Sequence, residues 1–205
     1  MLNRQTVLRP CAVSFAIALA LGLSACGGGG GGGSNVRPTP PPAQPGAIDT
    51  SFDSSTATTW SNVISGAGGL IKGGSGTLVL TGTNTYTGGT TINKGVLQLG
   101  NGGTTGSIIG DVKNYGSLVF EHSDNVTVNG IVSVSGSLVQ AGKGKVTLTG
   151  ANTYTGGTTI SAGTLQGDTA SLQGNIADNA SLVFNQNIAG TFAGVISGSG
   201  TLTQN

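Results

Sequence analysis

Side chains that could perform acid–base or metal chemistry are few in this sequence. Its seven carboxylates are spread along the chain, and its single histidine is His122. The tightest group is Glu121, His122 and Asp124, which has the residue types of a metal site or an acid–base pair. Because side chains of a strand alternate between its faces, Glu121 and His122 would point in opposite directions. We interpret this group as a solvated strand end and bend, and we assign no catalytic residue and no metal ligand.

The two cysteines, Cys11 and Cys26, both lie near the start of the chain, so the sequence after Cys26 has no disulfide framework. Arg4 and Arg9 are the basic residues of this leader, and an apolar run from residue 12 to residue 23 follows. That run is shorter than the roughly 20 residues that span a bilayer, and it matches the core of an export signal. We predict a signal peptide over residues 1–25.

Cys26 stands in the segment Leu23-Ser24-Ala25-Cys26-Gly27. This segment resembles the lipobox of bacterial lipoproteins, which implies cleavage before Cys26 and acylation of its thiol. Membrane lipid is then the expected partner. In that family a residue other than Asp after the cysteine implies sorting to the outer membrane, with the protein on its surface or its periplasmic face. A plain signal peptide cut near Ala25, which leaves Cys26 as a free thiol, is the alternative.

A spacer follows over residues 26–47, with an unbroken glycine run and five closely spaced prolines. Glycine runs form flexible coil and proline-rich segments stay extended, so we expect a disordered tether. Leader and spacer together resemble the start of subtilisin-type autotransporter lipoproteins, in which a serine protease domain follows. The Asp, His and Ser motifs of that domain are absent from this sequence, so we predict that the protein is not an enzyme. A truncated remnant of such a protease is the alternative.

The remainder of the chain contains an internal repeat. Residues 76–98 recur as residues 144–166, so that Tyr86 corresponds to Tyr154 at an offset of 68 in the numbering. The segments after each copy also correspond, with Ser117 matching Ser181 at an offset of 64. The difference between the two offsets falls at residues 101–109, where we expect a loop that tolerates insertion.

Short runs rich in Val, Ile, Leu and Thr, separated by Gly, Asn and Ser, predict an all-β fold. One coil of three short strands and three bends takes roughly 22 residues, so three coils account for about 66. We therefore predict a right-handed parallel β-helix, a solenoid of about seven rungs over residues 48–205. Its inward side chains form a thin aliphatic core, and Thr and Asn continue hydrogen bonding between rungs. An array of β-sandwiches, with units of about 100 residues, is the structural alternative.

Residues 80–97 and 148–165 share the pattern Leu-Thr-Gly-x-Asn-Thr-Tyr-Thr-Gly-Gly-Thr-Thr-Ile-x-x-Gly-x-Leu. It resembles the passenger-associated repeat of autotransporters, which implies the β-helical stalk of an exported passenger, with no chemistry of its own. Members of that family end in an outer-membrane barrel, for which this sequence offers no strands. We therefore expect a fragment of a longer autotransporter, with a short stalk protein as the alternative.

Charge narrows the function further. The formal net charge is +1, and loss of residues 1–25 removes Arg4 and Arg9, leaving six basic against seven acidic residues. This balance offers no footprint for nucleic acid. The segment from Gly73 to Leu78 resembles a calcium-binding nonapeptide, but Leu78 stands where the ligand Asp belongs, so we expect no cofactor or metal. We predict a structural, adhesin-like passenger fragment with an unknown host or cell-surface ligand; a β-helical carbohydrate binder is a further alternative.

Overall fold

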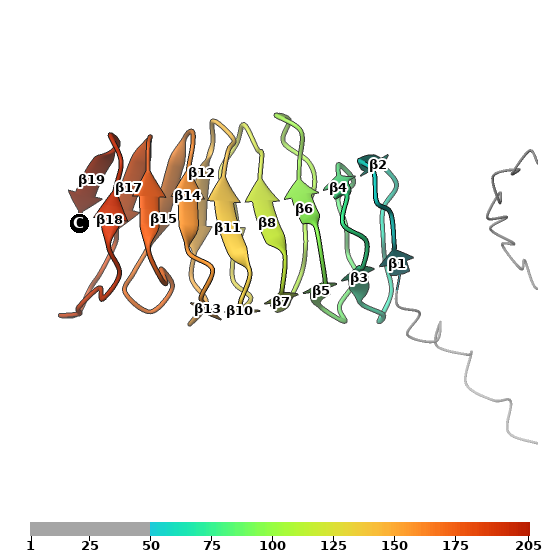
Figure 1. The fold of residues 1–205 in the computed structure, drawn as a ribbon, viewed down its shortest axis with the longest axis horizontal. Coiled ribbons are helices and arrows are strands. Elements are labelled where there is room, and N and C mark those ends of the chain that lie inside the picture. Colours follow the sequence, from blue (N-terminus) through green and yellow to red (C-terminus); the bar gives the residue numbers. More distant parts are fainter. Residues whose placement is uncertain (1–49) are drawn as a thin grey trace, which may run out of the picture. The chain divides into compact units, whose positions relative to one another are not determined.

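The computed structural model describes residues 50–205, and within them every regular element is a strand. The predicted signal peptide, the lipidation site Cys26 and the linker to residue 47 lie outside the described residues. Nineteen strands, β1 to β19, coil into a solenoid of about seven turns, with β1 and β2 at one end and β18 and β19 at the other (Figure 1). All pairings between strands are parallel. The prediction of an all-β parallel solenoid is confirmed.

Three sheets form the sides of the solenoid. The six-stranded sheet contains β1 (Thr50–Phe52), β3 (Leu70–Lys72), β5 (Thr90–Ile92), β7 (Val112–Asn114), β10 (Val132–Val134) and β13 (Thr153–Tyr154). The eight-stranded sheet contains β2 (Thr58–Trp60), β4 (Thr77–Leu80), β6 (Val96–Leu99), β8 (Ser117–Phe120), β11 (Ser137–Gln140), β14 (Thr158–Ile160), β16 (Ile176–Asp178) and β18 (Ile196–Ser197). The five-stranded sheet contains β9 (Val126–Val128), β12 (Lys145–Leu148), β15 (Thr164–Gly167), β17 (Ser181–Phe184) and β19 (Thr201–Gln204).

The core is a stack of aliphatic side chains that run from turn to turn. In the eight-stranded sheet Leu78, Leu97, Leu118 and Leu138 are successive register partners, and each is at most 2% exposed. Strand alternation explains this pattern, because every second residue points inward while its neighbours face solvent. Burial of one leucine contributes roughly 1.5–3 kcal/mol. Each turn hides its apolar residues against the next, so the fold depends on stacking.

Most turns are shorter than the sequence analysis predicted. Leu118 pairs with Leu138 on the next turn, and this offset of 20 is the commonest spacing between register partners. The extremes are an offset of 17, between Thr164 and Ser181, and an offset of 22, between Thr90 and Val112. In several turns one side is crossed by bends rather than by a strand; between β4 and β5, for example, no strand forms.

Shorter turns change where the repeats lie. We call residues 76–98 the first repeat and residues 144–166 the second. The offset of 68 between Tyr86 and Tyr154 exceeds three turns of the common length, and the excess advances the chain by one side. Strands β4 and β6 of the first repeat lie in the eight-stranded sheet, whereas β12 and β15 of the second lie in the five-stranded sheet. Likewise β5 lies in the six-stranded sheet and β14 in the eight-stranded sheet. The expectation of three whole rungs per repeat is therefore wrong.

Candidate functional site

The asparagine of the repeated pattern joins three consecutive turns. Asn84 accepts a hydrogen bond at Oδ1 from the backbone N–H of Ile64 at 2.9 Å, and its Nδ2 donates to the carbonyl of Ser107 at 2.8 Å. Asn152 does the same with Val132 at 2.7 Å and Ser171 at 2.7 Å. Both asparagines are buried. Each bridges the turn before and the turn after its own, which confirms the expected asparagine bonding between rungs.

The tyrosine of the pattern lies inside the solenoid. The hydroxyl of Tyr86 is 2.6 Å from Oγ1 of Thr90, and that of Tyr154 is 2.8 Å from Oγ1 of Thr158. Both rings are 1% exposed. Burial raises the pKa of Tyr86 to about 12, and it raises the pKa of Tyr154, although hydrogen bonding to the threonine acts in the opposite direction in both. These phenols fill and satisfy the core, and they have no access to a substrate.

The paired glycines of the pattern form a tight corner. Gly89 and Gly157 have φ values of +77° and +76°, a conformation that L residues with a side chain rarely adopt. A Cβ on the preceding Gly88 or Gly156 would lie 2.5 to 2.6 Å from the backbone of the turn before. The repeated pattern is thus explained by corners, core contacts and bridges between turns, all of which build the fold.

The one cluster of titratable side chains singled out in the sequence is also structural, but in a different way from the prediction. His122 is only 4% exposed, so it is not part of a solvated bend. Its Nδ1 is 3.1 Å from Oδ1 of Asp124, and its Nε2 is 2.9 Å from the carbonyl oxygen of Gly106. Glu121 points to the outer side, as alternation predicts, and bonds Gln98. The inward-facing ring of His122 contacts the loop between β6 and β7 through Gly106, and both of its nitrogens have hydrogen-bond partners.

A buried cation lies near the other end of the solenoid. Lys72 is 1% exposed, and its Nζ donates to the carbonyl oxygens of Gly74 and, at 3.2 Å, of Lys94. Burial lowers the pKa of Lys72, while the carboxylate of Asp53 acts in the opposite direction. Two backbone carbonyls thus satisfy this side chain, and it closes the corner between β3 and β4. That corner is the segment from Gly73 that resembles a calcium-binding nonapeptide.

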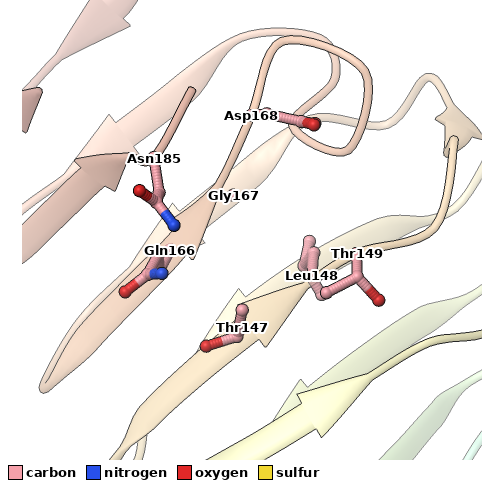
Figure 2. Close-up of a pocket in the computed structure, with 7 residues that line it drawn as sticks. All are labelled: Thr147, Leu148, Thr149, Gln166, Gly167, Asp168 and Asn185. Carbon is pink, nitrogen blue, oxygen red and sulfur yellow. The ribbon is translucent and has the colours of Figure 1, made fainter. Parts of the chain in front are cut away.

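Polar groups gather in a groove on the outer surface of the described solenoid. The groove has a volume of about 130 Å³ and is lined by Thr147, Leu148, Thr149, Gln166, Gly167, Asp168 and Asn185 (Figure 2). Thr147 on β12 and Gln166 on β15 are register partners, and Asn185 follows β17. The side chains of Thr147, Gln166 and Asn185 have no hydrogen-bond partner among residues 50–205. Sequence reasoning missed these residues, since nothing distinguishes them from other polar strand positions.

Asp168 is the charged residue of the groove lining. Its Oδ1 accepts hydrogen bonds from the backbone N–H groups of Ser171 at 2.7 Å and Ala170 at 3.0 Å. Burial alone would raise the pKa of Asp168, but hydrogen bonding to the Ser171 side chain and to these backbone N–H groups outweighs burial and holds the pKa below its usual value. The carboxylate therefore stays ionised near neutral pH, and its geometry is fixed by the loop that it begins.

No group of three or more His, Cys, Asp or Glu side chains in residues 50–205 is arranged to hold a metal ion. Nor does this part contain a helix long and apolar enough to cross a membrane. The predicted lipidation site, Cys26, lies outside the described residues and stays a prediction.

Comparison with known proteins relates the solenoid to autotransporters. The Passenger-associated-transport-repeat family matches residues 70–99 and 138–166, which overlap the two repeats. The adhesin BmaC autotransporter of Brucella suis biovar 1 is 42% identical over 183 residues, covering 76% of this chain and 5% of its own length. An extracellular serine protease of Serratia marcescens is 41% identical over 102 residues, covering 49% of this chain and 8% of its own.

A third relative carries a lipoprotein name. The Neisserial autotransporter lipoprotein NalP of Neisseria meningitidis serogroup B is 39% identical over 110 residues, covering 47% of this chain and 10% of its own length. The chain therefore spans 5% to 10% of the length of these three relatives. No solved structure matches the chain significantly. The prediction that the repeats are of the autotransporter passenger type is confirmed.

Proposed function

We propose, on the premise that residues 50–205 are an autotransporter passenger repeat region, that the protein is a lipid-anchored structural component of a bacterial outer membrane. In this proposal the solenoid acts as a stalk and an adhesin-like contact surface, and it performs no reaction. Acylated Cys26 supplies the anchor, and residues 26–47 hold the solenoid away from the lipid.

A single observation carries the structural role: the residues of the repeated pattern are committed to the fold. Asn84, Tyr86 and their counterparts Asn152 and Tyr154 are buried and hydrogen-bonded inside the solenoid. The ring of His122 is held at both nitrogens. A general base needs a ring nitrogen within reach of substrate, and this histidine offers none. These contacts favour a scaffold over an enzyme.

Support for the anchor comes from the sequence and from one relative. The segment Leu23 to Gly27 resembles a lipobox, and the Neisserial relative is itself named an autotransporter lipoprotein. One acyl chain binds membranes only reversibly, so an anchor of this kind requires the several chains of a bacterial lipoprotein cysteine. The matched variant is Cys26→Ser, which keeps the export signal and removes the acyl acceptor.

Metabolic labelling with a radioactive fatty acid, followed by membrane fractionation, tests the anchor. We expect label and outer-membrane recovery for the parent chain, and an unlabelled product outside that fraction for Cys26→Ser. Equal recovery of the parent chain and of Cys26→Ser in the outer-membrane fraction would contradict lipid anchoring. Protease added to intact cells then separates the two faces of the membrane, because only a surface-exposed solenoid is digested.

The alternative of a protease remnant rests on the Serratia relative, which is named an extracellular serine protease. A peptide-hydrolysis assay on the purified chain distinguishes the two functions. The structural role predicts no turnover above that of a solvent control, with or without a serine-directed inhibitor. Turnover that the inhibitor abolishes would contradict it.

A further inference from the structure

We propose that the groove lined by β12, β15, Asp168 and Asn185 binds a neutral, hydroxyl-rich ligand, chemically a sugar unit of a glycan. The inference adds a ligand class to the contact role proposed above and does not depend on the lipid anchor. It begins from a difference between the two repeats at equivalent positions.

In the first repeat the equivalent surface is closed by its own side chains. Gln98 corresponds to Gln166, and Glu121 corresponds to Asn185. Nε2 of Gln98 donates to Oε2 of Glu121 at 2.6 Å and to the carbonyl of Gly100 at 2.9 Å. A charge-assisted bond of this length holds the glutamine against the sheet.

The second repeat has the same backbone frame without that closure. Asn185 is too short and uncharged to replace the carboxylate, and the amides of Gln166 and Asn185 both stay without a protein partner within residues 50–205. Thr147 adds a hydroxyl, where the first repeat has Val79. Polar groups that bond each other in one repeat are thus left available in the other.

The lining determines which chemistry fits. Amides and hydroxyls both donate and accept hydrogen bonds, as do sugar hydroxyls. Asp168 adds an ionised acceptor, and no basic side chain lines the groove. An anionic ligand is therefore disfavoured, and a neutral polyol is favoured. A volume of about 130 Å³ is small beside the several hundred Å³ of a drug-sized site, so we expect a single ring to enter.

The groove is also held in shape before any ligand arrives. The backbone N–H of Asn185 donates to the carbonyl of Gly167 at 2.7 Å. Gln186 bonds Thr169 twice, through its Oε1 to the backbone N–H at 3.1 Å and through its Nε2 to Oγ1 at 3.0 Å. Preorganisation reduces the entropic cost of binding. With no aromatic ring in the lining, we expect dissociation constants in the millimolar range for a single sugar.

Saturation-transfer difference NMR on the full chain tests this proposal, because it detects weak binding through the ligand. The probes are D-glucose, D-galactose, D-mannose and N-acetyl-D-glucosamine, each at millimolar concentration, with N-acetylneuraminic acid as the anionic comparison. We expect saturation of at least one neutral sugar and at least five-fold less of the anionic one. No saturation of any neutral sugar would overturn the proposal.

Three variants locate the binding. Gln166→Ala removes one amide, and Asn185→Glu gives the second repeat the closure that Gln98 and Glu121 form in the first. Both should reduce the saturation signal at least five-fold. Gln98→Ala is the matched control and should keep the signal. Circular dichroism and thermal unfolding check that each variant folds.

The variants also separate this proposal from the anchor and stalk. Full signal in Asn185→Glu and in Gln166→Ala would overturn the assignment of the groove, and so would equal loss in Gln98→Ala. Either result leaves the fractionation of Cys26→Ser unchanged, so failure of the groove and failure of the proposed function are distinguishable. Should Gln166→Ala not fold, Asn185→Glu alone decides the outcome.

Discussion

The first and second repeats have nearly the same sequence, yet they occupy different sides of the solenoid. Strand β5 lies in the six-stranded sheet, and its counterpart β14 lies in the eight-stranded sheet. Inside, the same contacts recur: Asn84 and Asn152 bridge turns, and Tyr86 and Tyr154 bond threonines. These buried contacts of the repeat therefore form on more than one side of the solenoid.

Differences between the repeats lie both in the core, where buried Leu78 corresponds to buried Val146, and on the outer surface. Glu121 bonds Gln98 in the first, whereas Asn185 leaves Gln166 without a partner within residues 50–205 in the second. Because each repeat advances by one side, a surface feature repeated in every copy would be displayed around the axis rather than along one face. The similarity of the buried contacts in the two repeats and the difference between their outward side chains can be tested separately.

Truncation of the buried rings tests the similarity of the buried contacts with the largest expected effect. Tyr86→Ala and Tyr154→Ala each remove a fully buried aromatic side chain, which costs about 3–5 kcal/mol. Both rings are buried and both hydroxyls bond a threonine, although Tyr154 also accepts a hydrogen bond from the backbone N–H of Gln173. We expect the two losses to agree within about 1 kcal/mol. Urea unfolding followed by circular dichroism measures both. A near-neutral effect at one site would break the equivalence.

Alkaline pH tests the same rings without truncation. Burial raises the pKa of Tyr86 to about 12 from an ordinary value of 10.0. The buried, protonated Tyr86 therefore contributes to the free energy of unfolding in full below pH 10. That contribution is lost between pH 10 and 12, because in this range the tyrosine ionises in the unfolded chain but not in the folded one. The loss is roughly 2–3 kcal/mol, at 1.36 kcal/mol per unit.

The pH dependence of the urea midpoint measures this loss. Tyr86→Phe should flatten the dependence above pH 10, and Tyr154→Phe should act in the same direction, since its pKa is also raised. Tyr115→Phe, at a position that is 55% exposed, is the matched control and should leave the dependence unchanged. An equal effect of all three variants would argue against buried, protonated rings.

Removal of the bridging amides should have a smaller effect. Asn84→Ala and Asn152→Ala each leave a backbone N–H and a carbonyl of adjacent turns unpaired, at a cost of about 1–3 kcal/mol. Hydrogen exchange of the N–H groups of Ile64 and Val132 reports the loss locally. If each variant leaves the exchange of its own target N–H unaltered, the bridges contribute nothing.

The smallest effect is expected at Val134, in the segment after the first repeat, which corresponds to Gly198 in the segment after the second. Val134 has a φ of +70°, and the corresponding Gly198 has +113°. A β-branched residue in this region is strained, at a cost of about 1–3 kcal/mol, whereas glycine is not. Glycine loses more conformational entropy on folding than valine does, which offsets part of the strain that the substitution relieves. We therefore expect Val134→Gly to raise the free energy of unfolding, measured by thermal unfolding, by about 1 kcal/mol. Val134→Ala, which keeps a Cβ, should show no gain.

Strands and their inward residues could be predicted from the sequence because alternation is local. Leu78 and Leu97 are apolar between more exposed neighbours, and both point inward. The shift of the second repeat onto the next sheet of the solenoid could not be predicted. An offset of 68 residues fits three turns of about 22 residues, and it fits equally well three turns of about 20 residues plus the segment that crosses one further side. Only the turn length decides between these two arrangements, and it varies along the chain, with register offsets from 17 to 22 residues.

The groove and the buried histidine were hidden for the same reason. His122 continues the inward alternation of β8, but its burial also depends on Gly106 in the loop between β6 and β7, a contact between turns. Gln98 and Gln166 occupy the same position of the repeat, and they differ in the residues beside them on the adjacent turns. Contacts between turns decide their roles, and a single sequence does not reveal those contacts.

The advance by one side is tested most directly by pulsed EPR between spin labels at outward positions, with the native cysteines replaced by serine. Gln98 and Thr159 are three register steps apart on the eight-stranded sheet, about 14 Å between Cα atoms at about 4.8 Å per step. Thr91, the counterpart of Thr159, lies on the six-stranded sheet. We predict a shorter distance for Gln98 and Thr159 than for Thr91 and Thr159. The reverse order would contradict the advance and place both repeats on the same side.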